Sequence, residues 1–129
     1  MNFTKGRTYK WQEILTELDA VTGPPFYLLR RRADEVVVAA CLVIGVNPRA
    51  PYEIIPANGP LIRRYADKFC RQSDPIDVFV QEADGMWYYR GKFKLAGESK
   101  DANEIKLRAQ QANRRNLYKI LFLSEVAQP

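Results

Sequence analysis

Histidine and cysteine, two residue types that often act as a general base or a nucleophile, are absent or rare in this chain of 129 residues. It contains no histidine, which excludes histidine triads, histidine metal ligands and imidazole acid–base catalysis. The cysteines, Cys41 and Cys70, are too few for a thiolate zinc site, and their apolar neighbours predict buried, reduced thiols. The acid-x-lysine pair Glu104 and Lys106 falls on a predicted helix rather than at a strand end. These residue types favour binding over catalysis and predict no cofactor and no metal.

Aromatic rings lie beside polar groups in two segments, a combination that suits recognition of a nucleic-acid base. The candidates are Tyr52, Trp87 and Tyr89 for stacking, with Tyr88 on the opposite strand face, and Asn58, Asp77, Glu53 and Asp84 for the base edge. Core packing is the alternative role of Trp87 and Tyr89, and a helix cap is that of the segment Asn58-Gly59-Pro60. The segments predict a concave site between residues 52–58 and strand residues 87–92.

Basic residues outnumber acidic ones and give the chain a formal net charge of +5 and a pI near 9.3. This balance favours a polyanionic partner. The candidate phosphate contacts are Arg30, Arg31, Arg32, Arg63, Arg64, Lys68, Arg71, Arg90, Lys92, Lys94, Arg114 and Arg115. Arg63, Arg64, Lys68 and Arg71 lie opposite the apolar stripe of one predicted helix. They either contact phosphates or form a solvated face of that helix.

The N-terminal half predicts a helix followed by strands. The apolar residues of 11–18 recur at helical spacing and share one face. Strands are predicted at 26–29 and 35–44, joined by a charged turn at 30–34, with a brief extended piece at 52–55. Because the run at 35–44 is rich in valine and almost wholly apolar, it is predicted to be a central strand buried on both faces.

The C-terminal half predicts two helices, a hairpin and a last strand. Asn58-Gly59-Pro60 predicts the start of a helix, because proline suits the first helical position. A hairpin is predicted next, with strands at 76–80 and 86–95 and a turn at Ala83-Asp84-Gly85. A linker at 97–100 leads into a helix at 101–115, which has a thin apolar side at Ile105, Ala109 and Ala112. The last predicted element is a strand at 118–126.

The length and composition indicate one globular domain over residues 1–129, with 47% hydrophobic and 27% charged residues. Five or six strands with about three helices inserted between them predict an α+β class with a mixed, barrel-like sheet. The basic helix and terminal strand span 100–126. No apolar run reaches the roughly 18 residues that a membrane helix needs. Residues 1–7 contain no apolar signal core, so the expectation is a cytoplasmic protein with no membrane partner.

Short motifs in a particular order carry a family resemblance. They are a Gly-x-x-Tyr opening at Gly6, the run Asn-Gly-Pro-Leu-Ile-Arg-Arg-Tyr-Ala-Asp-Lys-Phe from Asn58, the strand from Ile76, and Tyr-Arg-Gly-Lys-Phe from Tyr89. This layout, over roughly residues 4–96, resembles the SRA-like (SET-and-RING-associated, or YDG) domains of the PUA-like superfold. The resemblance therefore implies a single PUA-like domain.

The resemblance also implies a reader of DNA bases, commonly modified cytosines, that flips the base into a pocket without catalysis. Bacterial members are often fused to restriction nucleases, so a nuclease or other effector subunit in restriction–modification is an implied partner. DNA is favoured over RNA by the resemblance alone. Two alternatives stay open: a small interaction or inhibitor protein that docks through its aromatic and basic face, as a subunit or phage-type factor, and a metal-free enzyme that uses Asp or Glu with Lys.

Overall fold

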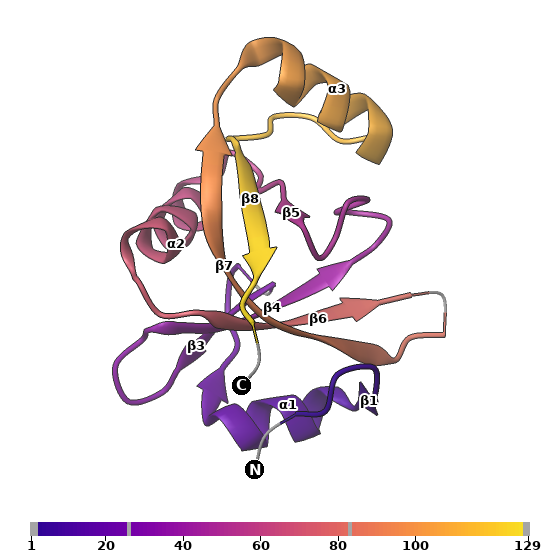
Figure 1. Cartoon of the computed structure of the whole chain (residues 1–129). Coiled ribbons are helices and arrows are strands. Elements are labelled where there is room, and N and C mark those ends of the chain that lie inside the picture. The colour runs from indigo at the N-terminus through magenta and orange to yellow at the C-terminus, as the bar shows by residue number, and fades with distance from the viewer. Residues whose placement is uncertain (1–2, 26, 83, 128–129) are drawn as a thin grey trace.

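Helices and strands are interspersed along the described part of the chain, residues 3–25, 27–82 and 84–127 of a computed structural model (Figure 1). The strands are β1 (Thr8–Tyr9), β2 (Ala20–Val21), β3 (Leu28–Arg31), β4 (Val37–Val43), β5 (Glu53–Ile54), β6 (Ile76–Gln81), β7 (Trp87–Ser99) and β8 (Ile120–Glu125). The helices are α1 (Trp11–Leu18), α2 (Pro60–Arg71) and α3 (Ala102–Ala112). The α+β class and the three helices that the sequence predicts are confirmed for these residues.

The sheet is mixed and has eight strands among the described residues. Its order is β2-β3-β4-β6-β7-β8-β5, and β1 pairs with β7 outside this path. The pair β4–β6 is parallel, because the chain crosses over through residues 44–75, which include α2, before it returns. The described pairings do not join β2 to β5, so the sheet is not closed and the predicted barrel is not confirmed. β2 and β5, the strands at the two edges, have two residues each and so offer few backbone N–H and C=O groups for further pairing.

β4 is a central strand, as the apolar run at 35–44 predicts. It lies between β3 and β6. Ala40 and Leu42 pack in a core cluster with Phe69 of α2, whereas Ala39 and Cys41 pack in a second cluster with Ile14 of α1 (alternate residues point to opposite faces). Both faces of the strand are therefore buried, which confirms the prediction.

α2 begins where its sequence predicts. Gly59 is the N-cap residue and Pro60 takes the first helical position, where its missing N–H leaves no bond unmade. Tyr65, Ala66 and Phe69 are buried on one face, so the helix presents its apolar stripe to the sheet and its basic residues to the outside.

The strand after the hairpin turn is longer than predicted. β7 continues to Ser99, through the segment predicted as a linker at 97–100, and pairs with β8 there. The register shifts between Leu95 and Gly97. An irregularity of this kind interrupts the two-residue alternation that marks a strand, which is why the pattern stops short of the strand's end. Figure 1 shows β7 running between α1 and α3, which lie at opposite ends of the molecule.

The hairpin between β6 and β7 turns at Gly85, whose φ of +76° is favourable for glycine, as the Asp-Gly pair predicts. Ala83 of this turn lies outside the described residues, as does Phe26, the first residue of the strand predicted at 26–29. Leu28 and Leu29 of that strand are confirmed within β3, whereas Tyr27 lies in a turn before it.

Arg30 belongs to β3, so the charged turn predicted at 30–34 starts too early. Its side chain is buried, at 7% exposure, and its guanidinium lies 4.1 Å from the centroid of the Tyr65 ring. Nη1 also donates to the carbonyl of Pro24 at 3.3 Å. The Tyr65 ring of α2 therefore stabilises the buried Arg30 cation through a cation–π contact. The residues next to Arg30 in the sequence predict an exposed side chain instead.

α3 is attached to the sheet through a buried ion pair. Arg108, 8% exposed, donates from Nε and Nη2 to the two carboxylate oxygens of Glu53 in β5, at 3.0 and 2.9 Å. Ile105 and Ala109 are half-buried on the same side, as the helical spacing predicts, but the central contact of this face is polar. Among the described helices, none combines the length and apolar character needed to cross a membrane.

Candidate functional site

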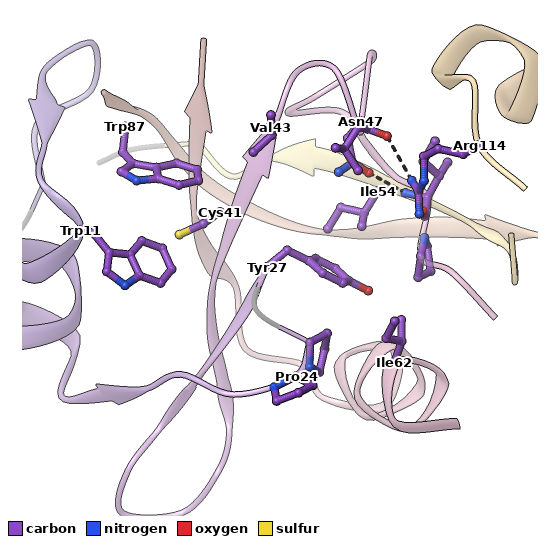
Figure 2. Close-up of a pocket in the computed structure, with 14 residues that line it drawn as sticks. Trp11, Pro24, Tyr27, Cys41, Val43, Asn47, Ile54, Ile62, Trp87 and Arg114 are labelled. Atoms are coloured by element: carbon purple, nitrogen blue, oxygen red, sulfur yellow. Dashed lines mark hydrogen bonds between the residues drawn. The ribbon is translucent and has the colours of Figure 1, made fainter. Parts of the chain in front are cut away.

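A largely apolar pocket of about 600 Å³ lies beside the end of β4 (Figure 2). Its lining residues are Trp11, Pro24, Pro25, Tyr27, Cys41, Val43, Val46, Asn47, Ile54, Ile55, Pro56, Ile62, Trp87 and Arg114. They come from α1, α2, the three strands β4, β5 and β7, and the segments around them. A volume of this size falls within the range of pockets that enclose small-molecule ligands, roughly 300–1,000 Å³.

Two tryptophans form one end of the pocket (Figure 2). Trp11 is the first residue of α1 and Trp87 is the first residue of β7, and the pairing of Tyr9 with Trp87 brings the two segments together. Their ring centroids are 5.5 Å apart with planes inclined by 39°. Both side chains are half-buried, so part of each indole surface is available to a planar ligand.

Arg114 forms the opposite end. α3 ends at Ala112, and the left-handed backbone (φ 52°) of its C-cap residue Asn113 turns the chain back toward residues 44–56. Arg114 Nη1 then donates to the carbonyls of Val46 at 3.0 Å and Ile55 at 2.7 Å. No carboxylate in the described ranges pairs with this guanidinium. Burial lowers the pKa of Arg114 from its ordinary value, which reflects a cation set in apolar surroundings.

Tyr27 lies between the two ends, and its ring extends toward the Arg114 end in Figure 2. Its hydroxyl oxygen is buried and has no hydrogen-bond partner in the described part of the protein. Burial raises the pKa of this hydroxyl far above its ordinary value, so it stays protonated and can donate. A buried hydroxyl without a partner costs free energy, and a ligand oxygen in the pocket would supply that partner.

The loop that closes the pocket after β4 is fixed by Asn47. This side chain is 5% exposed, and its Oδ1 accepts the backbone N–H of Ile55 at 2.9 Å. Together with the two bonds from Arg114, this contact holds residues 46–47 beside residues 54–56 and gives the pocket a defined wall.

The pocket lies partly where the sequence predicts a concave site. Trp87 and residues 54–56 line it. Tyr52 and Asn58, in the same predicted loop, are exposed and do not line it. Tyr52 is 53% exposed and its ring meets that of Phe93 edge-on, with centroids 5.8 Å apart.

Asp77 and Tyr89 lie in a buried network instead. The Tyr89 hydroxyl donates to Asp77 Oδ1 at 2.6 Å, and Lys92 Nζ donates to the same oxygen at 3.1 Å. Burial, with the bond to Asp77 second, raises the pKa of Tyr89 well above its ordinary value. The structure thus gives these three residues a role in joining β6 to β7, and none of them lines the pocket.

The other acidic candidates for a base edge have partners of their own. Glu53 is paired with Arg108, and Asp84 accepts the backbone N–H of Met86 at 3.0 Å and the hydroxyl of Tyr88. Neither residue lines the pocket.

The basic candidates divide by exposure. Arg63, Arg64 and Arg71 are exposed on α2, and Lys68 is half-buried there. On β7, Arg90 is half-buried. Ile62 in the first turn of α2 lines the pocket, and Arg63 follows it in the sequence.

Thiol and metal chemistry find little support in the described residues. Burial raises the pKa of Cys41 far above its ordinary value and that of Cys70 to about 11, so both remain thiols near neutral pH. No group of three or more acidic or cysteine side chains within residues 3–25, 27–82 and 84–127 is arranged to hold a metal ion.

Sequence reasoning missed Trp11, Tyr27 and Asn47 as pocket residues and named Arg114 only among many cations. A signal existed for Tyr27, an aromatic residue that closely follows Pro24-Pro25 in a segment unable to continue a helix. Trp11 fits the apolar face of α1, and nothing local marks its second contact with Trp87.

Comparisons of this chain with protein-family models, with curated proteins and with solved structures found no match.

Proposed function

We propose that this chain is a nucleic-acid-binding protein that receives one base of its target in the pocket and catalyses no reaction on it. The observation that carries the proposal is the combination of two indole surfaces and an unpaired hydroxyl in one cavity. A flipped base requires a stacking face and hydrogen-bond partners for its edge, and the pocket offers both. Stacking alone contributes about 1–3 kcal/mol per base.

The resemblance to SRA-like domains extends this proposal. It adds a PUA-like domain with a barrel-like sheet, a modified base in DNA as the target, and a nuclease or other effector as the partner in a cytoplasmic restriction–modification system. Within the proposal, Trp87 keeps its predicted stacking role. The base edge is read by Asn47 in place of Asn58 and Asp77.

The basic surface of α2 supports the proposal from outside the pocket. Arg63, Arg64 and Arg71 project from a helix whose Ile62 lines the pocket, so a strand with one base inserted would carry its flanking phosphates past them. Contacts of this kind position a nucleic acid without reading its sequence.

A second candidate function is the docking of a partner protein, favoured by exposed aliphatic residues at the pocket rim. Val43, Ile44 and Val46 are 38%, 38% and 44% exposed, and two of them line the pocket. Exposed aliphatic groups next to aromatic rings and arginine are typical of a protein interface.

Binding of labelled nucleic acids tests the proposal. Fluorescence anisotropy with modified duplex, unmodified duplex, single-stranded DNA and RNA, from about 50 to about 200 mM salt, is expected to show affinity that falls steeply with salt. Modified duplex is expected to bind most tightly. If none of these probes binds at the lowest salt, the proposed function is wrong and protein docking becomes the favoured function.

Reversal of charge on α2 is expected to weaken nucleic-acid binding in a manner independent of sequence. In the variant Arg64→Glu/Arg71→Glu, affinity should fall alike for all probes, and the slope of log affinity against log salt should decrease by about two. The reason is that each lost phosphate contact releases one condensed counterion fewer. Anisotropy titrations at several salt concentrations measure both quantities.

A charge-matched control is Lys100→Glu/Lys106→Glu, which changes the net charge equally at exposed positions near α3. This variant should lose much less affinity than the α2 variant. Equal losses in the two variants would show that net charge, and not the α2 surface, governs binding.

A further inference from the structure

The polar end of the pocket presents hydrogen-bond donors. The Tyr27 hydroxyl has no partner among the described residues. Arg114 uses Nη1 for the carbonyls of Val46 and Ile55, whereas its Nε and Nη2 groups donate to no residue that the structure describes. Asn47 also lines the pocket, and its Oδ1 already accepts the Ile55 N–H. A ligand group at this end must therefore accept hydrogen bonds.

Charge at this end favours an anion over a neutral acceptor. The guanidinium of Arg114 carries a full positive charge without a carboxylate partner in the described ranges. Its surroundings are mostly apolar side chains, which screen the charge less than water does. An oxyanion accepts from the guanidinium fork with two oxygens and from a hydroxyl with a third.

The two ends together define one ligand chemistry. Trp11 and Trp87 suit a planar aromatic group, and Arg114 with Tyr27 suits an oxyanion at the other end (Figure 2). A pocket of about 600 Å³ has room for more than a bare base. We propose that the pocket binds a nucleotide as a unit, with its base against the tryptophans and its phosphate on Arg114 and Tyr27. This inference rests on the proposed function and adds the phosphate to it.

Calorimetric titration with 2′-deoxycytidine and 2′-deoxycytidine 5′-monophosphate, at one ionic strength, tests the inference on the full chain. The monophosphate is expected to bind at least about tenfold more tightly than the nucleoside, since hydrogen bonds to a charged group are the stronger kind. Equal affinities would overturn the inference and leave the proposed function standing.

Two variants locate the effect. Tyr27→Phe and Arg114→Gln should each remove most of the preference for the monophosphate over the nucleoside. Tyr27→Phe carries little risk of misfolding, because the hydroxyl it removes has no partner. The matched controls Tyr52→Phe and Arg115→Gln change exposed residues outside the pocket and should keep the preference. A preference that survives in both pocket variants would overturn the inference.

The source of the phosphate is resolved by a third probe, the dinucleotide d(CpC) with its internal phosphodiester and no terminal phosphate. If Tyr27→Phe weakens its binding as it weakens that of the monophosphate, the phosphate belongs to a continuous strand. If only the monophosphate responds, the pocket takes a free nucleotide or a strand end.

Binding of longer oligonucleotides without binding of any of these small probes would overturn the inference. Binding of the monophosphate without binding of oligonucleotides would support it while the proposed function fails.

Discussion

Replacing Trp87 with alanine is expected to weaken binding of a short DNA by about ten- to a hundredfold, because base–aromatic stacking contributes about 1–3 kcal/mol. The indole is half-buried and lies at the pocket against Trp11. The variant Trp87→Phe retains an aromatic face and should recover most of the affinity. Anisotropy titration of the three proteins with the same oligonucleotide measures the series.

Stability measurements separate this role from core packing. Because Trp87 also packs against the core cluster around Phe79, some destabilisation accompanies Trp87→Ala. A loss of about 3–5 kcal/mol, with unchanged affinity of the folded protein, would assign the ring to packing alone. Tyr52→Ala is the matched control, since Tyr52 is an exposed aromatic residue outside the pocket and its loss should change neither quantity strongly.

Replacing Lys119 with methionine is expected to lower the free energy of unfolding by about 3 kcal/mol at neutral pH. Lys119 is 3% exposed, and its Nζ donates to Asp67 of α2 at 2.8 Å and to Glu98 of β7 at 2.7 Å. The variant leaves two carboxylates facing each other without their cation. Both carboxylates are partly exposed, so water screens part of this effect and keeps the loss at the lower end of the range for buried pairs.

The cluster of Lys119, Asp67 and Glu98 also predicts how the free energy of unfolding depends on pH. Burial alone would raise the pKa of Asp67, but hydrogen bonds from Lys119 and Tyr118 hold it below the ordinary value, and the bond from Lys119 lowers the pKa of Glu98. A carboxyl whose pKa is lower in the folded state stabilises the fold above its unfolded pKa and loses that contribution as the pH falls. The protein should therefore lose stability as the pH drops below about 4.

Urea unfolding at pH 7 and near pH 3 measures both effects. In Lys119→Met the acid-dependent loss that comes from Asp67 and Glu98 should be smaller or reversed, because protonation then relieves their repulsion. Lys106→Met, at an exposed position of α3, should stay within about 0.5 kcal/mol of the parent protein. A Lys119 variant as stable as this control would show that the cluster does not hold α2 to the sheet.

Local patterns predicted the elements whose signals are local. The apolar run of β4 and the Gly59-Pro60 start of α2 are properties of adjacent residues, so both could be predicted from the sequence. The extension of β7 through residues 97–99 could not, because the irregularity after Leu95 breaks the alternation and only pairing with β8 reveals the strand.

Buried charges escaped prediction for a related reason. Arg30, Arg108 and Lys119 look like surface residues in the sequence, where charged side chains usually are. Each is accommodated by a partner distant in the chain: the Tyr65 ring, the Glu53 carboxylate, and the Asp67 and Glu98 carboxylates. Such pairings arise from topology, and a single sequence carries no signal for them.

The pocket was predicted in part. Trp87 and the segment around residues 52–58 were expected to border a concave site, and Trp87 and residues 54–56 do line the pocket. Asp77 was expected to face a base, but its carboxylate is engaged by Tyr89 and Lys92. The lone hydroxyl of Tyr27 could not be foreseen, since the absence of a partner depends on everything folded around it.

The position of the tryptophans has a spectroscopic consequence. The chain contains two tryptophans, and both line the pocket with ring centroids 5.5 Å apart. The indole emission of this protein, and the indole contribution to its near-ultraviolet circular dichroism, therefore originate beside the pocket. Occupancy that stacks a base on the rings should quench the emission, whereas detachment of α1 should separate the rings, abolish their exciton coupling and shift the emission to the red. The unlabelled chain thus carries an optical reporter that distinguishes a filled pocket from a dismantled one.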